Sequence, residues 1–271
     1  MIVEWCYDTY TNHNTKLIMS VFATNIQRKI KQRGWDLYQQ TKSVKCVGIK
    51  TLINQFCKPF DAETQAKKSS VNPNSKWFGM SVEEILATWE SNRNSKANKG
   101  LGLDDWIGHV YDGSDFDKTI ASEQLLNTCK QFDLFKSEYL DKNNIELVCR
   151  EQWLQNDTGT IKGRLDALYT LQNKLLLIDW KSVEEIKTEN KWQKLLGPLS
   201  DLDDCKMHLM TLQLWMYKYL LKHFYDVEIS SCRIIQITPT TYNILKPSFP
   251  YNDKLICDCI EWALNNLHNN I

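Results

Sequence analysis

Three short segments with the composition of β-strands follow one another in the middle of this chain of 271 residues. They are Ile145–Leu154, Thr160–Leu171 and Lys174–Trp180, and turn-forming residues separate each from the next. The third segment contains Leu175-Leu176-Leu177-Ile178, an unbroken apolar run that is typical of a central strand covered on both faces. We therefore predict a β meander inside a covered sheet.

Segments with helical character precede and follow the meander. We expect helices at Val21–Arg33, Lys50–Cys57, Phe60–Ser69, from Ser81 onward, at Leu103–Tyr111, Ile120–Tyr139, His208–Phe224 and Asp253–His268, and a further strand at Val227–Thr238. This order predicts an α/β (α+β) fold with a central mixed β-sheet whose meander core is flanked by helices. We expect a single domain over residues 1–271, with a helical N-terminal part (about 1–140) packed on a core (about 141–271).

The charges are balanced overall but unevenly distributed. Lys plus Arg and Asp plus Glu both number 33, which counts against a protein whose whole surface binds nucleic acid. The segment Gln27–Lys50 is nevertheless strongly basic, whereas Asp104–Asp117 and Asp201–Asp204 are acidic. A net charge of zero can therefore hide a basic face beside an acidic, metal-attracting pocket.

Several classes of protein are disfavoured by simple features. No apolar run is long enough to span a bilayer, and Met1–Tyr10 lacks the pattern of a signal peptide. The nine cysteines form no matched pair of C-x-x-C motifs, so we expect reduced thiols rather than a disulfide framework. These features predict a soluble, intracellular protein with no membrane partner.

Charged residues follow the apolar run of the third strand. Asp179 and Lys181 are two positions apart, so their side chains should project from one face. If the second and third strands pair around Gln172-Asn173, Asp166 should lie near Asp179 across the ladder. Burying unpartnered charges is costly, and carboxylate oxygens suit Mg²⁺ or Mn²⁺. A surface Asp–Lys pair at a strand end is the alternative for Asp179 and Lys181 taken alone.

Several motifs occur in the order and spacing of a known nuclease family. Gly163-Arg164-Leu165-Asp166 precedes Asp179-Trp180-Lys181, Glu151 lies on the strand before, and Gln213 and Tyr217 fit a Q-x-x-x-Y helix. Together they resemble the RecB-like branch of the PD-(D/E)XK nuclease superfamily, and are similar to the mitochondrial genome maintenance exonucleases and related viral or phage exonucleases. The resemblance implies a restriction-endonuclease-like fold.

The resemblance also implies roles for these residues. It implies a site for Mg²⁺ or Mn²⁺ formed by Asp166, Asp179, the Trp180 carbonyl and Asp104. Lys181 would position the attacking water and offset charge on the phosphate, while Glu151 would support a second ion or orient Lys181. No iron–sulfur cluster is expected, because the cysteine spacing does not fit one. Contacts to DNA would come from Gln213, Tyr217, Arg164 and Ser182.

One position departs from the family pattern. Asp104 stands where the RecB-like branch usually has a metal-binding histidine, four residues after Gly100. The nearest imidazole, His109, shares a helix face with Asp105 rather than with Asp104, and a structural histidine is the favoured interpretation. The alternative role for Asp104 is to cap a helix over Asp105–Tyr111.

Taken together, the sequence favours a metal-dependent DNA nuclease. The resemblance implies an exonuclease that acts on single-stranded or frayed ends in DNA repair, replication or recombination, in the cytoplasm, nucleoid or nucleus. The alternatives are a nuclease-fold DNA-binding protein with weak or no catalysis, and a nuclease directed at RNA. Tryptophans among polar neighbours are candidates for stacking on bases: Trp35, Trp77, Trp89 and Trp192.

Overall fold

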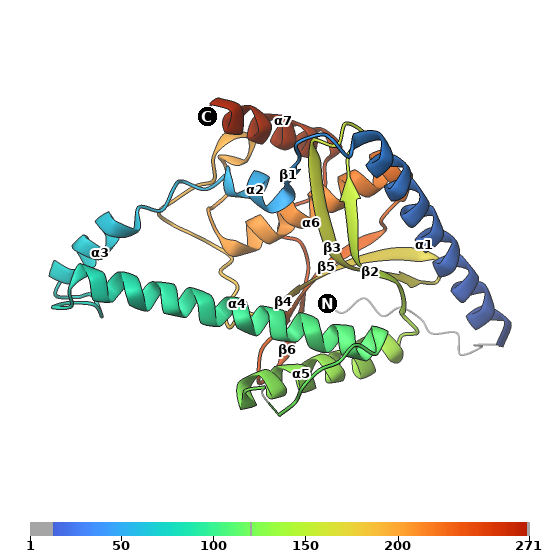
Figure 1. Cartoon of the computed structure of the whole chain (residues 1–271), viewed down its shortest axis with the longest axis horizontal. Coiled ribbons are helices and arrows are strands. Elements are labelled where there is room, and N and C mark those ends of the chain that lie inside the picture. The colour runs from blue at the N-terminus through green and yellow to red at the C-terminus, as the bar shows by residue number, and fades with distance from the viewer. Residues whose placement is uncertain (1–12, 120, 270–271) are drawn as a thin grey trace. The chain divides into compact units, whose positions relative to one another are not determined.

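The computed structural model describes residues 13–119 and 121–269 (Figure 1). The prediction for Met1–Tyr10 falls outside the described residues. The helices are α1 (His13–Thr41), α2 (Ile49–Asn54), α3 (Ala62–Val71), α4 (Val82–Asp112), α5 (Glu123–Phe135), α6 (Lys206–Tyr225) and α7 (Asp253–Asn269), with a π-helical turn at Lys136–Asp141 and a 3₁₀ turn at Gly197–Leu199. No helix in this part of the chain is long and apolar enough to cross a membrane.

The strands are β1 (Val47–Gly48), β2 (Glu146–Gln155), β3 (Ile161–Leu171), β4 (Lys174–Lys181), β5 (Ser231–Ile237) and β6 (Tyr242–Leu245). They form a six-stranded sheet in the order β1-β3-β4-β5-β6, and β2 also pairs with β3. The pairing of β1 with β3 is parallel and that of β3 with β2 and β4 antiparallel. The predicted α+β fold, a mixed sheet flanked by helices, is therefore confirmed.

The chain divides into two compact units, each assembled from separate segments. The first contains residues 1–49, 137–179 and 214–233, and the second contains residues 50–136, 180–213 and 234–271. The first unit holds α1, β1, β2, β3 and most of β4. The second holds α2 to α5, β6 and α7. The predicted single domain with a helical part and a core stays a prediction.

The meander follows the predicted strands closely because its turns are encoded locally. Gln172 and Asn173, between β3 and β4, have φ angles of 50° and 59°, as in the two-residue turns that match the twist of a hairpin. Gly159, between β2 and β3, has a φ of 70°. The four apolar residues of β4, from Leu175 to Ile178, are all buried. Two strands were not predicted, namely β1 and β6, which pairs antiparallel with β5.

Strand β3 pairs with three other strands although a strand has only two edges. β1 and β2 both pair with Lys162, and β2 and β4 both pair with residues 167–170. Because two strands that pair with the same residue must occupy opposite edges, β1 and β4 share one edge of β3. Between them lies the stretch from Gly163 to Asp166, which we call the fork.

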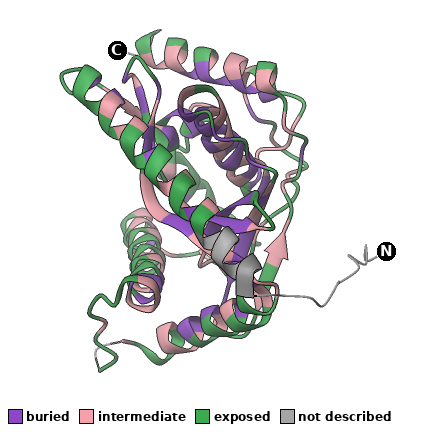
Figure 2. Cartoon of the chain, turned by 90° about the vertical axis from the view of Figure 1, so that its right-hand side faces the viewer, coloured by how far each residue is buried: buried purple, intermediate pink, exposed green. Residues whose placement is uncertain are grey.

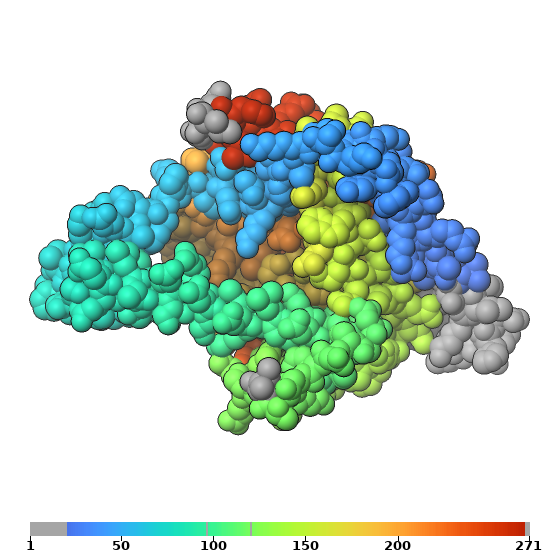
Figure 3. Space-filling view, in the orientation of Figure 1, coloured from blue at the N-terminus to red at the C-terminus, as the bar shows by residue number. Residues whose placement is uncertain are grey.

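In the first unit, α1 lies against β2. The amide of Gln155 donates a hydrogen bond to the hydroxyl of buried Tyr225, at the end of α6. An added Cβ on Gly34 of α1 would lie 3.7 Å from the Tyr225 ring and 4.0 Å from the carbonyl oxygen of Trp153. Figure 2 shows the outward side of α1 as largely exposed, and Figure 3 shows the surface of β2 and β3 beside α1. Helix α1 therefore packs against β2, the first strand of the meander.

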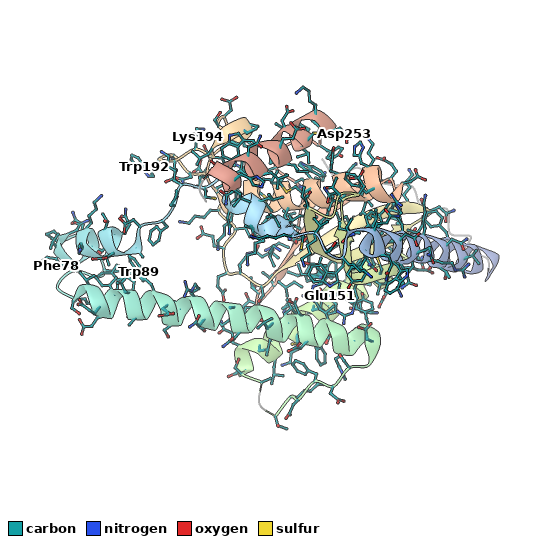
Figure 4. The ribbon with its side chains drawn as sticks, turned by 45° about the horizontal axis from the view of Figure 1, so that its top comes forward. Phe78, Trp89, Glu151, Trp192, Lys194 and Asp253 are labelled. Atoms are coloured by element: carbon teal, nitrogen blue, oxygen red, sulfur yellow. The ribbon has the colours of Figure 1, made fainter. Side chains whose placement is uncertain are left out.

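In the second unit, α4 is one uninterrupted helix of 31 residues. Ser81 and Glu84 form the predicted capping box, and Gly113 ends the helix with a φ of 69°. Helix α3 lies beside the beginning of α4, and Figure 4 shows Phe78 and Trp89 at this end of the pair. The interpretation of Asp104 as an N-cap is wrong, because the helix that contains it begins at Val82.

Replacing Gly163 with alanine should destabilise the fork. An added Cβ would lie 2.7 Å from both Ile49 Cδ1 and Tyr217 Cε1, which is much closer than non-bonded carbons approach. We expect Gly163→Ala to lower the free energy of unfolding by about 1–3 kcal/mol in a urea titration. Gly100→Ala is the matched control, because no atom lies within 4 Å of its added carbon, and there the change should stabilise α4 by about 0.5–1 kcal/mol. Equal stability of the two variants would contradict the packing of Tyr217 on Gly163.

Candidate active site

Two of the carboxylates singled out in the sequence lie at the fork. The ladder between β3 and β4 ends with the pair Ala167 and Ile178, and the next residues are Asp166 on β3 and Asp179 on β4. Both belong to the first compact unit. Residues at facing positions of antiparallel strands project from the same face, so the two carboxylates are neighbours where the strands part.

Glu151 extends this pair into a row across three strands. The ladder pairs on either side of it are Arg150 with Ala167 and Gln152 with Leu165. Glu151 on β2 therefore faces Asp166 on β3, just as Asp166 faces Asp179 on β4. Adjacent strands are about 4.8 Å apart, so three acidic residues occupy consecutive positions across the sheet.

The backbone of Glu151 is locally strained and its side chain is held. Its φ of 50° lies in the left-handed region, which costs a residue with a side chain about 1–3 kcal/mol. Its carboxylate forms an ion pair with Arg164, in which Oε2 lies 2.7 Å from Nε. Figure 4 labels Glu151 among the side chains of β2. The arginine therefore offsets part of the negative charge of the row.

The three carboxylates differ in their exposure to solvent. Asp179 is only 1% exposed, whereas Asp166 and Glu151 are half-buried. Asp179 makes other interactions, but its Oδ2 atom is shielded from solvent and accepts no hydrogen bond in the described part of the chain. A hard divalent cation fits such a donor set, since carboxylate oxygens are the ligands it prefers.

The side chains alone do not form a complete metal site. In residues 13–119 and 121–269, no group of three His, Cys, Asp or Glu side chains is arranged to hold a metal ion. Glu151 forms an ion pair with Arg164, and Asp166 and Asp179 are the other two carboxylates of the row. A cation held between them would need backbone carbonyl or water oxygens to complete its coordination.

Trp180 and Lys181 continue β4 beyond Asp179. The indole ring of Trp180 is buried and packs edge-on against Phe132 and Phe135 of α5, with ring centroids 5.6 and 5.8 Å apart. Because side chains alternate along a strand, Lys181 projects from the same face of β4 as Asp179, opposite to Trp180. The aromatic contacts thus fix the direction in which the end of β4 presents Lys181.

Tyr217 and Gln213 lie one turn apart on α6. The hydroxyl of Tyr217 donates a hydrogen bond to the carbonyl oxygen of Arg164 at 2.8 Å, and its ring contacts Gly163. Tyr217 thereby supports the backbone of the fork. Gln213 is half-buried on the preceding turn, on the same side of the helix as Tyr217.

Ser182 follows β4 and lines a cavity of about 310 Å³ in the second unit. The side-chain amide of Gln236 donates hydrogen bonds to the carbonyl oxygens of Val183 and Glu184, at 2.9 and 3.1 Å, and so holds the wall of this cavity in place. Hydroxyl, ammonium and carboxylate groups all line it, namely those of Ser182, Thr128, Thr238, Lys99, Lys187, Lys206, Glu184 and Glu185.

Asp104 and His109 both lie in the last third of α4, in the second unit. The side chain of Asp104 is exposed in the helix interior. His109 is half-buried, stacks near Trp106, and its Nδ1 donates a hydrogen bond to the carbonyl oxygen of Ser114 at 2.6 Å. This contact gives His109 a structural part in ending the helix.

The basic segment Gln27–Lys50 serves two purposes in the structure. Lys29 pairs with Asp226, and Arg33 Nε donates to the carbonyl oxygen of Phe224, so both tie α1 to the end of α6. The outward side of α1 instead forms a shallow hollow of about 320 Å³, whose lining includes Arg28, Lys31 and Trp35.

Several of the described cysteines are buried, and their thiols do not ionise at neutral pH. All of them are free thiols. Burial raises the pKa of the Cys149 and Cys232 thiols to about 12, and burial together with the neighbouring Asp204 raises the pKa of Cys57 to about 12. Thiolates are the nucleophilic and metal-binding form, so at neutral pH these groups are inert.

Trp153 and Lys162 are exposed side chains near the carboxylates that were missed in the sequence. Trp153 on β2 faces Arg164 on β3, and Lys162 lies two positions before Arg164. The alternation of β3 identifies Lys162, because Lys162 and Arg164 are exposed while Ile161, Gly163 and Leu165 are buried. Trp153 is identified only through its pairing with Arg164.

Comparisons with known proteins give little further information. No protein-family model and no curated protein matches the chain. Among solved structures, it is similar to the one described as "Crystal structure of SSO0001", with 13% sequence identity over 93% of this chain and 86% of that chain. The TM-score is 0.34, and a likeness at this level carries no argument about fold or activity.

Neutralising one member of the carboxylate row should stabilise the fold. Asp179 is buried beside Asp166, and like charges in a poorly solvated place repel each other. We expect Asp179→Asn to raise the free energy of unfolding by about 0.5–2 kcal/mol in the presence of EDTA, as often happens when a functional site is dismantled. The exposed Asp201 supplies the control, and Asp201→Asn should change stability by less than about 0.5 kcal/mol. A lower melting temperature for Asp179→Asn would mean that the carboxylate serves the fold instead.

Proposed function

We propose that this chain is a metal-dependent DNA nuclease, and that it acts as an exonuclease on single-stranded or frayed ends. The observation that supports the proposal best is the placement of Asp166 and Asp179 at the fork, where β3 and β4 separate. Lys181 follows on the same face of β4, and Glu151 faces Asp166 from β2. Acidic residues gathered where two strands separate suit the chemistry of phosphodiester hydrolysis, because their oxygens can bind a divalent cation.

The carboxylates of Asp166 and Asp179 and the carbonyl oxygen of Trp180 would hold Mg²⁺ or Mn²⁺. When bound, such an ion lowers the pKa of a water ligand and neutralises charge on the scissile phosphate. All three groups offer oxygen, which these hard cations prefer over nitrogen or sulfur.

Lys181 would supply the remaining positive charge. Its ammonium group would hydrogen-bond the attacking water and stabilise negative charge that develops on the phosphate oxygens. Glu151 would orient Lys181 or support a second ion. Because Glu151 is tied to Arg164, a phosphate that draws Arg164 away would release the Glu151 carboxylate.

The substrate contacts would come from the residues that the resemblance assigns to them. Arg164 is half-exposed and can form bidentate contacts with phosphate. Tyr217 holds the Arg164 carbonyl, while Gln213 and Ser182 would add hydrogen bonds. We place this activity in an intracellular setting, in DNA repair, replication or recombination.

A nuclease-fold DNA-binding protein with weak or no catalysis is the second candidate. It is favoured by the aspartate at position 104, where a metal-binding histidine was expected. An RNA-directed nuclease with the same site would differ only in its choice of substrate.

Asp179 and Lys181 should have separable roles. Asp179→Asn should abolish both calorimetric Mn²⁺ binding and cleavage, because it removes a metal ligand. Lys181→Ala should retain Mn²⁺ and DNA binding but lower the cleavage rate by about 10²–10³-fold, the loss typical of one charge-stabilising group. Loss of Mn²⁺ binding in Lys181→Ala but not in Asp179→Asn would reverse the two assignments and refute the proposal.

The resemblance alone proposes Asp104 as a metal ligand, and its variants test that role. Asp104→Ala should lower metal affinity by about 10–100-fold, with turnover partly restored by high metal. Its melting temperature should not fall, since alanine favours a helix interior more than aspartate does. Asp104→His should retain activity with a shift towards Mn²⁺, and His109→Ala should leave turnover unchanged. Normal turnover and metal affinity in Asp104→Ala would remove Asp104 from the site.

A further inference from the structure

Trp153 is a large aromatic residue that the fold leaves open to solvent. It is 55% exposed although it lies within β2 and is paired there with β3. Burying such a ring is strongly favourable, so its exposure in a strand calls for a reason. The strand itself does not require it, because a polar residue would serve an exposed β position equally well.

Two cations of β3 lie against the Trp153 ring. Lys162 Nζ is 5.6 Å and Arg164 Cζ is 5.8 Å from the ring centroid, within the range of cation–π attraction. Arg164 faces Trp153 directly across the ladder, and the Nε of Arg164 is also anchored on Glu151. The ring is therefore held in a defined orientation, while more than half of the residue's surface remains accessible.

The same face of the sheet carries the acidic row. Trp153 lies two positions from Glu151 on β2, and Arg164 lies two positions from Asp166 on β3. Two residues along a strand span about 6.5–7 Å. The Trp153 ring and its two cations are therefore close to the carboxylates of Glu151 and Asp166. All of these residues belong to the first compact unit.

We propose that Trp153, Lys162 and Arg164 form a binding site for single-stranded nucleic acid. One unpaired base stacks on the exposed part of the Trp153 ring, and the adjoining phosphates contact Lys162 and the terminal nitrogens of Arg164. Aromatic rings beside basic groups bind single strands in this way without reading their sequence. The inference rests on the proposed function for its substrate class, and it names the part of the surface that holds the strand next to the carboxylates.

Stacking makes the site selective for unpaired bases. In a duplex the face of each base is covered by its neighbours, so only the phosphates would reach Lys162 and Arg164. The site should therefore prefer a single strand to a duplex of equal length. It should also prefer bases to abasic sugar phosphates, which carry the same charge but no ring. This second comparison separates stacking from simple charge attraction.

The test is a fluorescence anisotropy titration in EDTA, in which no cleavage occurs. Labelled oligothymidine and an abasic oligonucleotide of the same length are titrated with the wild type, Trp153→Ala and Trp153→Phe. Trp153→Ala should weaken oligothymidine binding by about 5- to 150-fold, Trp153→Phe should retain most of the affinity, and abasic binding should be unchanged by either. Phe78→Ala is the control, since Phe78 is an aromatic residue of similar exposure (56%) in the second unit and should have no effect. Lys162→Gln should reduce the slope of log affinity against log salt by about 1.

Several outcomes would overturn the inference. These are unchanged oligothymidine affinity in Trp153→Ala, an equal loss on the abasic strand, or no measurable binding of single strands by the wild type. Because the titration contains no metal, it is independent of catalysis. Trp153-dependent binding by a protein that never cleaves DNA would refute the proposed nuclease and leave the binding site standing. Cleavage by a protein whose strand binding does not depend on Trp153 would refute the binding site and leave the proposed nuclease standing.

Discussion

The structure depends on the two edges of β3. One edge is taken along its length by β2, and the other is divided between β4 and the short parallel strand β1. Because β4 and β1 cannot both occupy the same residues, β4 must leave β3 before Ile161 and Lys162, and its last pair with β3 is Ile178 with Ala167. That separation creates the fork, and Asp166 and Asp179 are the first residues beyond the last ladder pair.

Neighbouring groups offset part of the charge of the acidic row and support the backbone beside it. Arg164 pairs with Glu151, and Tyr217 holds the carbonyl of Arg164 while its ring packs on Gly163. The same arginine contacts the exposed Trp153 ring. Arg164 thus connects the acidic row and the proposed binding surface through its side chain, and helix α6 through its backbone carbonyl. Changes at Arg164 should therefore affect metal binding, strand binding and stability together.

The sequence predicted those features that short-range chemistry determines. The turn residues Gln172 and Asn173 fixed the hairpin, and this made Asp166 and Asp179 neighbours. The fork could not be predicted, because it depends on the pairing of β1 with β3. The paired residues Val47 and Ile161 are far apart in the chain. The sequence predicted a separate helix at Leu103–Tyr111, but α4 runs without interruption from Val82 to Asp112. Trp153 was missed because its exposure follows from the register of β2 against β3.

The central claim is that the residues at the fork support metal-dependent hydrolysis of DNA ends. The most direct measurement incubates the wild type with end-labelled linear and circular single strands of DNA, each with Mg²⁺, Mn²⁺ or EDTA. We expect the linear strand to be degraded with either metal, the circular strand to survive, and EDTA to stop all cleavage. Degradation that continues in EDTA, or intact linear DNA with both metals in a folded protein, would contradict the claim.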